Sequence, residues 1–339
     1  MINFNLVDPE AAALKILSFF LFLFLTIAPP LAFSQSSDAR DGTAVEGTSY
    51  IHPGSELWNN VRQRTFADKT TQVKSTDSSI LINLTGETWR QFRMSELIPI
   101  GGIAIIVGLV GVLLFRLIRG NIKIEGGRSD KKILRFSISQ RTVHWAVAIM
   151  FVILAFTGLL LLFGRLVIIP LMGNEAFSYI AVTAKFIHDY LSPLFAVSLV
   201  AMFIIFAKEN IPSLKEDINW VLKGGGLFGK HVSADRYNAG EKGWFWLASI
   251  IGGAIIVSGL VLLFPIFDQT RATMEWYHVI HSIAAISMIV GSIGHIYMGT
   301  AAMEGTFEVM KTGYCDSNWA KSHHDLWYEK VKDKEVSNR

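Results

Sequence analysis

The sequence predicts an all-α, polytopic membrane protein. Hydrophobic residues make up 51% of its 339 residues and charged residues only 17%, whereas a soluble domain carries about 25% charge. Several uninterrupted apolar runs approach the roughly 20 residues that a helix needs to cross a bilayer. Aromatic residues are abundant, with 23 Phe and 9 Trp, which excludes disorder over most of the chain.

The first apolar run, from Leu14 to Ala32, resembles a secretory signal peptide. Lys15 lies at its start, and the small residues Ala32 and Ser34 close it in the pattern of a cleavage site. We therefore expect residues 1–34 to be a signal peptide, with an uncleaved anchor helix as the alternative. The polar residues 35–96, rich in Ser, Thr, Asp and Gly, are expected to form a periplasmic segment.

Five further apolar stretches are long enough to cross a bilayer. They are Leu97–Leu117, Val143–Phe163, Phe186–Phe206, Gly243–Phe264 and Tyr277–Met298. We expect the first of them, with its linker, to form an extra transmembrane helix over residues 97–130. The other four are expected to form a four-helix domain over residues 131–302, and residues 303–339 a tail.

The loops between these spans differ in their Lys and Arg content, which predicts the orientation. The loops after the first and third spans, and the tail, are basic, whereas the two opposite loops are nearly bare, with Arg165 and Arg271. The basic regions are therefore expected in the cytoplasm and the mature N-terminus in the periplasm, so that the chain lies in a bacterial inner membrane. The net charge of +3 is small, and basic residues beside apolar runs indicate membrane topology rather than nucleic-acid binding.

Five of the nine histidines fall in or at the edges of the spans: His144, His188, His278, His281 and His295. An ionisable residue in hydrocarbon is costly, so by default it faces the bundle interior and has a partner. His281 and His295 are 14 residues apart on one predicted helix, which places them within about 40° of a common face and about 21 Å apart in height. His278 lies about 100° off that face, so an interfacial position or a propionate contact is expected for it.

His188 begins its span at the depth of His281, and His144 at the depth of His295. Two His–His pairs, one above the other, are therefore predicted, and a bis-imidazole pair across a helical bundle is typical of a b-type haem. A non-haem metal site usually needs three or four close ligands. A proton relay needs carboxylates, which the spans almost lack. The single cysteine, Cys315, excludes a Cys-ligated iron–sulfur cluster in this chain.

Several motifs resemble the gamma, or cytochrome b, subunit of membrane-bound formate dehydrogenases, in a long form with an N-terminal extension. They are Arg141-Thr-Val-His-Trp145 followed by Thr157-Gly158, Phe186-Ile-His188, Arg236-Tyr-Asn-Ala-Gly-Glu-Lys242, Ile280-His281 and Gly294-His295-Ile-Tyr-Met298. The resemblance covers about residues 131 to 334, with the histidine spacing intact.

The resemblance implies a four-helix core with two haems b, the outer one ligated by His188 and His281 and the inner one by His144 and His295. It implies partners as well: a molybdenum or tungsten alpha subunit that oxidises formate in the periplasm, and an iron–sulfur beta subunit. Electrons would reach a quinone, menaquinone or ubiquinone, on the cytoplasmic side. The family's quinone pocket maps onto Asn238 and Gly240, with His295 close by.

Other interpretations remain open at this stage. Asn238 is also a good helix cap, so its loop need not bind quinone. The chain could instead be the diheme anchor of a nickel–iron hydrogenase or of another quinone-linked respiratory oxidoreductase, or a haem-free anchor or transporter. His323 and His324 lie in a polar tail and are expected on a solvated surface.

Overall fold

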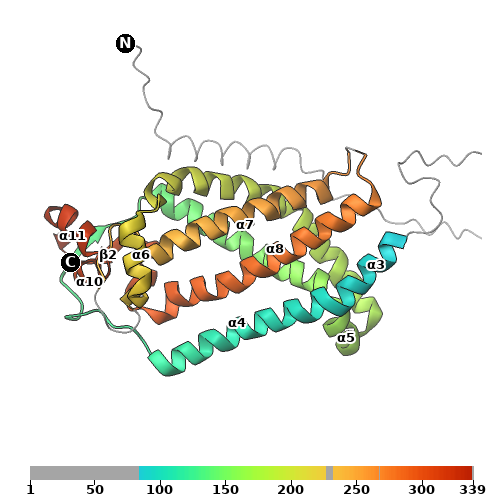
Figure 1. Ribbon diagram of the computed structural model, residues 1–339, viewed down its shortest axis with the longest axis horizontal. Helices are drawn as coiled ribbons and strands as arrows, with labels where there is room; N and C mark the ends of the chain where they lie inside the picture. Colours follow the sequence, from blue (N-terminus) through green and yellow to red (C-terminus); the bar gives the residue numbers. More distant parts are fainter. Residues whose placement is uncertain (1–83, 227–231, 267, 338–339) are drawn as a thin grey trace, which may run out of the picture.

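A computed structural model describes residues 84–226, 232–266 and 268–337, and the predicted signal peptide and most of the periplasmic segment lie outside these ranges. The described part is a bundle of long helices with a small α/β cap at one end (Figure 1). Within it, four helices are long and apolar enough to cross a membrane. The predicted all-α membrane fold is confirmed. The end that carries the cap is called the sheet end below.

Helix α5 (Ile138–Phe206) contains two of the predicted spans. It starts at a capping box in which the Ser137 hydroxyl accepts from the backbone of Gln140, and it bends at Gly173, where φ is +83°. Its two halves then run side by side, because Thr157 Oγ1 lies 2.9 Å from Nδ1 of His188. A straight helix would separate these two residues by about 47 Å. One continuous helical segment therefore supplies two antiparallel crossings.

Helices α7 (Ala239–Leu263) and α8 (Arg271–Tyr297) form the other two core crossings. Helix α4 (Ile98–Arg119), the predicted extra helix, lies along α8 (Figure 1). Small residues permit this approach: a Cβ on Gly101 would lie 2.6 Å from Ile286, and one on Gly108 would lie 3.4 Å from Val290. The rest of α4 shows apolar side chains to the outside, as a lipid-facing helix does.

Helix α3 (Leu84–Phe92) leads through a short π-turn (Arg93–Leu97) into α4. A side-chain contact fixes this segment to α5, since the Arg93 guanidinium donates to the Leu161 carbonyl at 3.1 Å. At the sheet end, a 3-10 turn (Ala207–Asn210), α6 (Leu214–Leu222) and a glycine turn (Gly224–Gly226) connect α5 towards α7. A second π-turn (Met298–Ala302) ends α8.

The cap consists of a three-stranded antiparallel sheet and three short helices. Strand β1 (Lys131–Leu134) lies between β2 (Tyr314–Asp316) and β3 (Val336–Ser337). The helices are α9 (Thr306–Thr312), α10 (Ser317–His323) and α11 (Asp325–Val331), and a 3-10 turn (Lys332–Lys334) leads to β3. The strand pairing joins the start of the predicted 131–302 domain to the predicted tail.

The expectation that His324 lies on a solvated surface is wrong. The structure buries His324 to 1% exposure, together with Trp319, Ala320, Val309 and Cys315 of the cap. The His324 ring donates from Nδ1 to the Asp235 carbonyl at 2.7 Å. The prediction failed because the tail is rich in charged residues, and its helices are too short for periodicity to indicate which apolar residues pack against β1.

Candidate functional site: two stacked histidine pairs

Two histidine pairs lie inside the bundle, each joining α5 to α8. The ring centroids of His188 and His281, the far pair, are 6.2 Å apart. Those of His144 and His295, the sheet-side pair, are also 6.2 Å apart. Because His281 and His295 lie 14 residues apart on α8, the two pairs are separated by about 21 Å along the helix axis. The partners expected from depth and helix face are therefore neighbours in the structure.

The spacing within each pair fits a shared iron. With metal–nitrogen bonds of about 2.0 Å on both sides, two imidazole rings have centroids roughly 6 Å apart. Both observed separations match this value. Across the described ranges, no cluster of three or more His, Cys, Asp or Glu side chains is arranged to hold a metal ion. The donor set in each pair thus suits a group that brings its own equatorial ligands, as a porphyrin does.

Hydroxyl groups hold both rings of the far pair. The Thr157 hydroxyl lies 2.9 Å from Nδ1 of His188, and the Ser258 hydroxyl lies 3.1 Å from Nδ1 of His281. Each hydroxyl residue is followed by a glycine that leaves room for the ring: a Cβ on Gly158 would lie 3.4 Å from His188, and one on Gly259 would lie 3.3 Å from His281. The glycine of the Thr157-Gly158 motif therefore lies directly against the His188 ring.

The sheet-side pair has different neighbours. Trp244 of α7 stacks on His295, with centroids 4.8 Å apart and planes 14° apart. His144 meets the edge of Trp145 at 5.4 Å, and its Nδ1 atom is buried without a hydrogen-bond partner among the described residues. Trp145 in turn donates to the Met310 carbonyl of the cap. Aromatic contacts therefore position both rings of this pair.

His278 lies apart from both pairs. Its Nδ1 atom hydrogen-bonds the Met274 carbonyl at 2.8 Å, and its ring contacts Trp89 of α3 at 5.9 Å. The side chain is exposed. This placement agrees with the helical-wheel expectation that His278 is off the ligand face.

The Arg236–Lys242 motif is held by a dense polar network. Arg135 and Arg236 each donate to the backbone carbonyl of the other at 2.6 Å. The buried Arg135 guanidinium also pairs with Glu241 at 3.0 Å, and Lys242 pairs with Asp217 of α6 at 2.9 Å. These contacts fix where α7 begins. These ion pairs were not predicted, although three charges lie within seven residues at a helix start in the sequence.

Two residues of this motif, Asn238 and Gly240, were expected to bind quinone. Asn238 caps α7: its Oδ1 accepts from the backbone N–H of Glu241 at 3.0 Å, and the Glu241 carboxylate accepts from the backbone N–H of Asn238 at 3.0 Å. A Cβ on Gly240 would lie 3.0 Å from the Trp220 ring, so glycine permits that ring to pack there. Gly240 precedes Trp244 by one helical turn on the same face, which brings the motif close to the Trp244–His295 stack.

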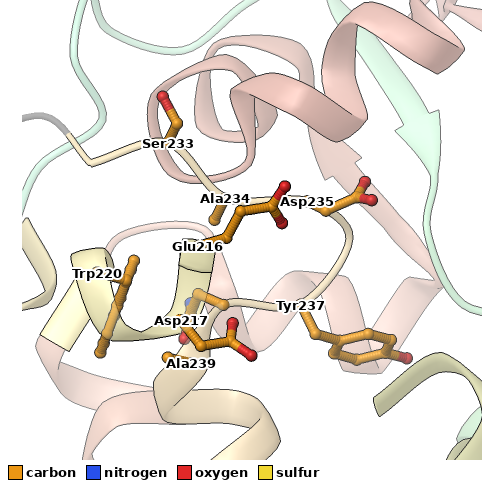
Figure 2. A pocket seen from close by; sticks show the side chains of 9 residues that line it. Glu216, Asp217, Trp220, Ser233, Ala234, Asp235, Tyr237 and Ala239 are labelled. Atoms are coloured by element: carbon orange, nitrogen blue, oxygen red, sulfur yellow. The ribbon is translucent and has the colours of Figure 1, made fainter. Parts of the chain in front are cut away.

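Two hollows open at the sheet end. The first lies between Trp220 of α6 and the segment Ser233–Tyr237, with the carboxylates of Glu216, Asp217 and Asp235 around it (Figure 2). It encloses no space for a water molecule, so it does not by itself accommodate a quinone ring. The second, of about 510 Å³, is lined by residues that include Lys123, Thr300 and Phe307. Phe307 meets Trp145 edge-on at 6.1 Å, and Trp145 meets His144 at 5.4 Å, so two aromatic rings connect this hollow to the sheet-side pair.

A helical membrane bundle with interior histidine pairs of this spacing has the architecture of a b-type cytochrome. Comparison with family models agrees, because the model described as prokaryotic cytochrome b561 matches residues 135–313. The chain belongs to this family, whose members are membrane-integral and carry haem b.

Curated relatives are cytochrome b subunits of formate dehydrogenases. The nitrate-inducible formate dehydrogenase cytochrome b556(Fdn) subunit of Escherichia coli (strain K12) is 30% identical over 223 residues, which cover 61% of this chain and 95% of that protein. The cytochrome b556(fdo) subunit of the same organism is 29% identical over 59% of this chain and 93% of its own length. The formate dehydrogenase cytochrome b556 subunit of Haemophilus influenzae is 27% identical over 59% of this chain and 84% of its own length.

Proposed function

We propose that this chain is the membrane electron-transfer subunit of a formate dehydrogenase, carrying electrons from an iron–sulfur subunit to quinone. The observation that carries the proposal is the pair of His–His contacts, both at 6.2 Å and stacked along α8. The names of the relatives support the choice of formate dehydrogenase. Haem b at each pair, when bound, supplies a one-electron carrier.

The residues of the chain have distinct tasks in this proposal. His188 and His281 would hold the outer haem through Nε2, because Nδ1 of each faces a hydroxyl. His144 and His295 would hold the inner haem, with Trp244 fixing the plane of the His295 ring. Apolar side chains of the same helices, such as Leu154 and Phe195, are buried in the core and keep water from the path between the pairs.

The orientation proposed from the basic loops places the sheet end in the cytoplasm and the far pair towards the periplasm. Formate oxidation on a molybdenum or tungsten subunit outside would then deliver two electrons inward through the iron–sulfur subunit. Quinone reduction uses two electrons and two protons, and a site at the sheet end would draw those protons from the cytoplasm. Charge is thereby separated without a proton channel through the bundle.

The proposed acceptor site uses Asn238, Gly240 and His295. Because Oδ1 of Asn238 is engaged by the helix cap, its amide NH₂ is the group left to donate to a quinone oxygen. The one-turn distance between Gly240 and Trp244 supports a position beside the sheet-side pair.

A haem count tests the proposal. We expect a pyridine haemochrome assay on the purified full chain to give two haems b per polypeptide. His188→Ala should remove one spectral component and His144→Ala the other, while His278→Ala, the matched control on α8, should keep both. One haem or none in the wild-type protein, or loss of the same component in both variants, would refute the assignment. Copurification with formate-to-quinone activity distinguishes this role from that of a hydrogenase anchor.

A further inference from the structure

The far pair is held by two equivalent hydroxyl–glycine steps on different helices, Thr157-Gly158 on α5 and Ser258-Gly259 on α7. Both hydroxyl residues are buried, Thr157 to 3% exposure and Ser258 to 0%. Each hydroxyl meets Nδ1 of one histidine, at 2.9 Å and 3.1 Å respectively. The two rings of one pair thus receive the same support from two different helices.

The direction of these hydrogen bonds follows from the hydroxyl protons. The Thr157 hydroxyl lies 3.0 Å from the Ile153 carbonyl, and the Ser258 hydroxyl lies 2.6 Å from the Ala254 carbonyl. A hydroxyl has one proton, and a carbonyl can only accept, so each proton is used within its own helix. The hydroxyl oxygen therefore accepts from Nδ1–H of the histidine.

Backbone carbonyls point to the same tautomer. Each hydroxyl also lies 3.1 Å from a second carbonyl, that of Leu154 for Thr157 and that of Ile255 for Ser258. Because the hydroxyl protons are directed to these carbonyls, Nδ1 carries the proton in both rings and Nε2 is free to bind a metal. The sheet-side pair lacks this arrangement at His144, whose Nδ1 has no hydrogen-bond partner within the described ranges.

We propose that Thr157 and Ser258 are positioning residues that lower the reduction potential of the haem at the far pair relative to the haem at the sheet-side pair. A ligating imidazole that donates its other N–H becomes a more basic ligand. A more basic ligand stabilises the ferric state, so a hydrogen bond from Nδ1–H of a ligating imidazole to a hydroxyl lowers the reduction potential. The proposal rests on the proposed function, and it makes one-electron transfer from the far pair to the sheet-side pair favourable.

The test is a spectroscopic redox titration of the purified full chain. Thr157→Val and Ser258→Ala remove the hydroxyls with little change of shape, and Thr157→Ser keeps the hydroxyl. We expect the double variant Thr157→Val/Ser258→Ala to shift one midpoint upward by an equilibrium factor of about ten, which is about 59 mV for a one-electron couple. The other midpoint potential of the double variant, and both midpoint potentials of Thr157→Ser, should stay unchanged.

Ser249→Ala is the matched control. Ser249 also lies on α7 and donates to a backbone carbonyl, that of Phe245, at 2.7 Å, and within the described part of the chain it has no hydrogen bond to a histidine. It should leave both midpoints unchanged. Two haems with unshifted midpoints in the double variant would overturn it, whereas a wild-type chain without two haems would instead refute the proposed function.

Discussion

Asn238 offers a test that separates a structural role from a quinone-binding role. Its Oδ1 caps α7 through the backbone N–H of Glu241 at 3.0 Å, and its amide NH₂ is proposed to contact quinone. Asn238→Ala removes both groups, whereas Asn238→Ser keeps a capping oxygen and removes the amide. The two variants therefore differ only in whether a side-chain oxygen caps helix α7.

The expected magnitudes follow from these bonds. Loss of an N-cap costs about 1 kcal/mol of stability, and loss of one hydrogen bond to quinone costs about 1 kcal/mol of binding. Since about 1.4 kcal/mol corresponds to tenfold in affinity, the affinity for quinone should fall roughly fivefold in both variants. Thermal stability should fall only in Asn238→Ala. Both haems should remain reducible by formate.

The assay is steady-state quinone reduction by the full complex in proteoliposomes, combined with thermal unfolding of each variant. Asn238→Ser with wild-type quinone kinetics would show that the residue is a helix cap only. If Phe307→Ala then weakened quinone binding, the acceptor would belong in the second hollow at the sheet end. Proton uptake from the periplasmic face would contradict the site and the orientation together.

Two further predictions concern the cap and the far pair. Burial, with Arg135 nearby, lowers the pKa of His324 to about 3, so the ring is neutral in the fold, whereas it titrates near 6.5 when unfolded. The stability contributed by the neutral ring is therefore fully present above pH 6.5 and is lost as the pH falls towards 3, by up to about 1.4 kcal/mol per pH unit. Between pH 7.5 and 5.5, the melting temperature of His324→Gln should depend less on pH than that of the wild-type chain. An equal pH dependence of the two proteins would refute this. Gly259→Ala places a Cβ 3.3 Å from His281, whereas a Cβ on Gly253 of the same helix meets nothing within 4 Å. Only Gly259→Ala should perturb the far-pair spectrum, and equal spectra of the two variants would contradict the packing.

The histidine pairs could be predicted because α-helical geometry is regular. The 14-residue separation of His281 and His295 fixes their relative height and the helix face that they share, and the basic loops fix the orientation of each span. The surroundings of the rings could not be derived in the same way. Thr157 and Ser258 reach the histidines across helix interfaces, and the rotation of each helix depends on side-chain packing that a single sequence does not specify.

A repeated pattern was nevertheless available in the sequence. A hydroxyl residue followed by glycine occurs at Thr157-Gly158 and again at Ser258-Gly259, each in a span that faces the far pair. The tail was harder, because its strands are two or three residues long and gain stability only by pairing with β1, nearly 200 residues earlier in the chain. Such long-range pairing leaves no local periodicity.

The Arg236–Lys242 motif connects the α/β cap to the sheet-side histidine pair. Asn238 sets the first residue of α7, and therefore the height and rotation of Trp244, one turn beyond Gly240. Trp244 stacks on His295 at 4.8 Å, so a shift at the start of α7 is transmitted to a histidine of the sheet-side pair. The far pair depends instead on Ser258, whose position nearly four turns beyond Trp244 along α7 is fixed by its own hydroxyl and by the adjoining glycine. Weakening the Asn238 helix cap should therefore alter the spectrum of the sheet-side pair and leave the spectrum of the far pair unchanged.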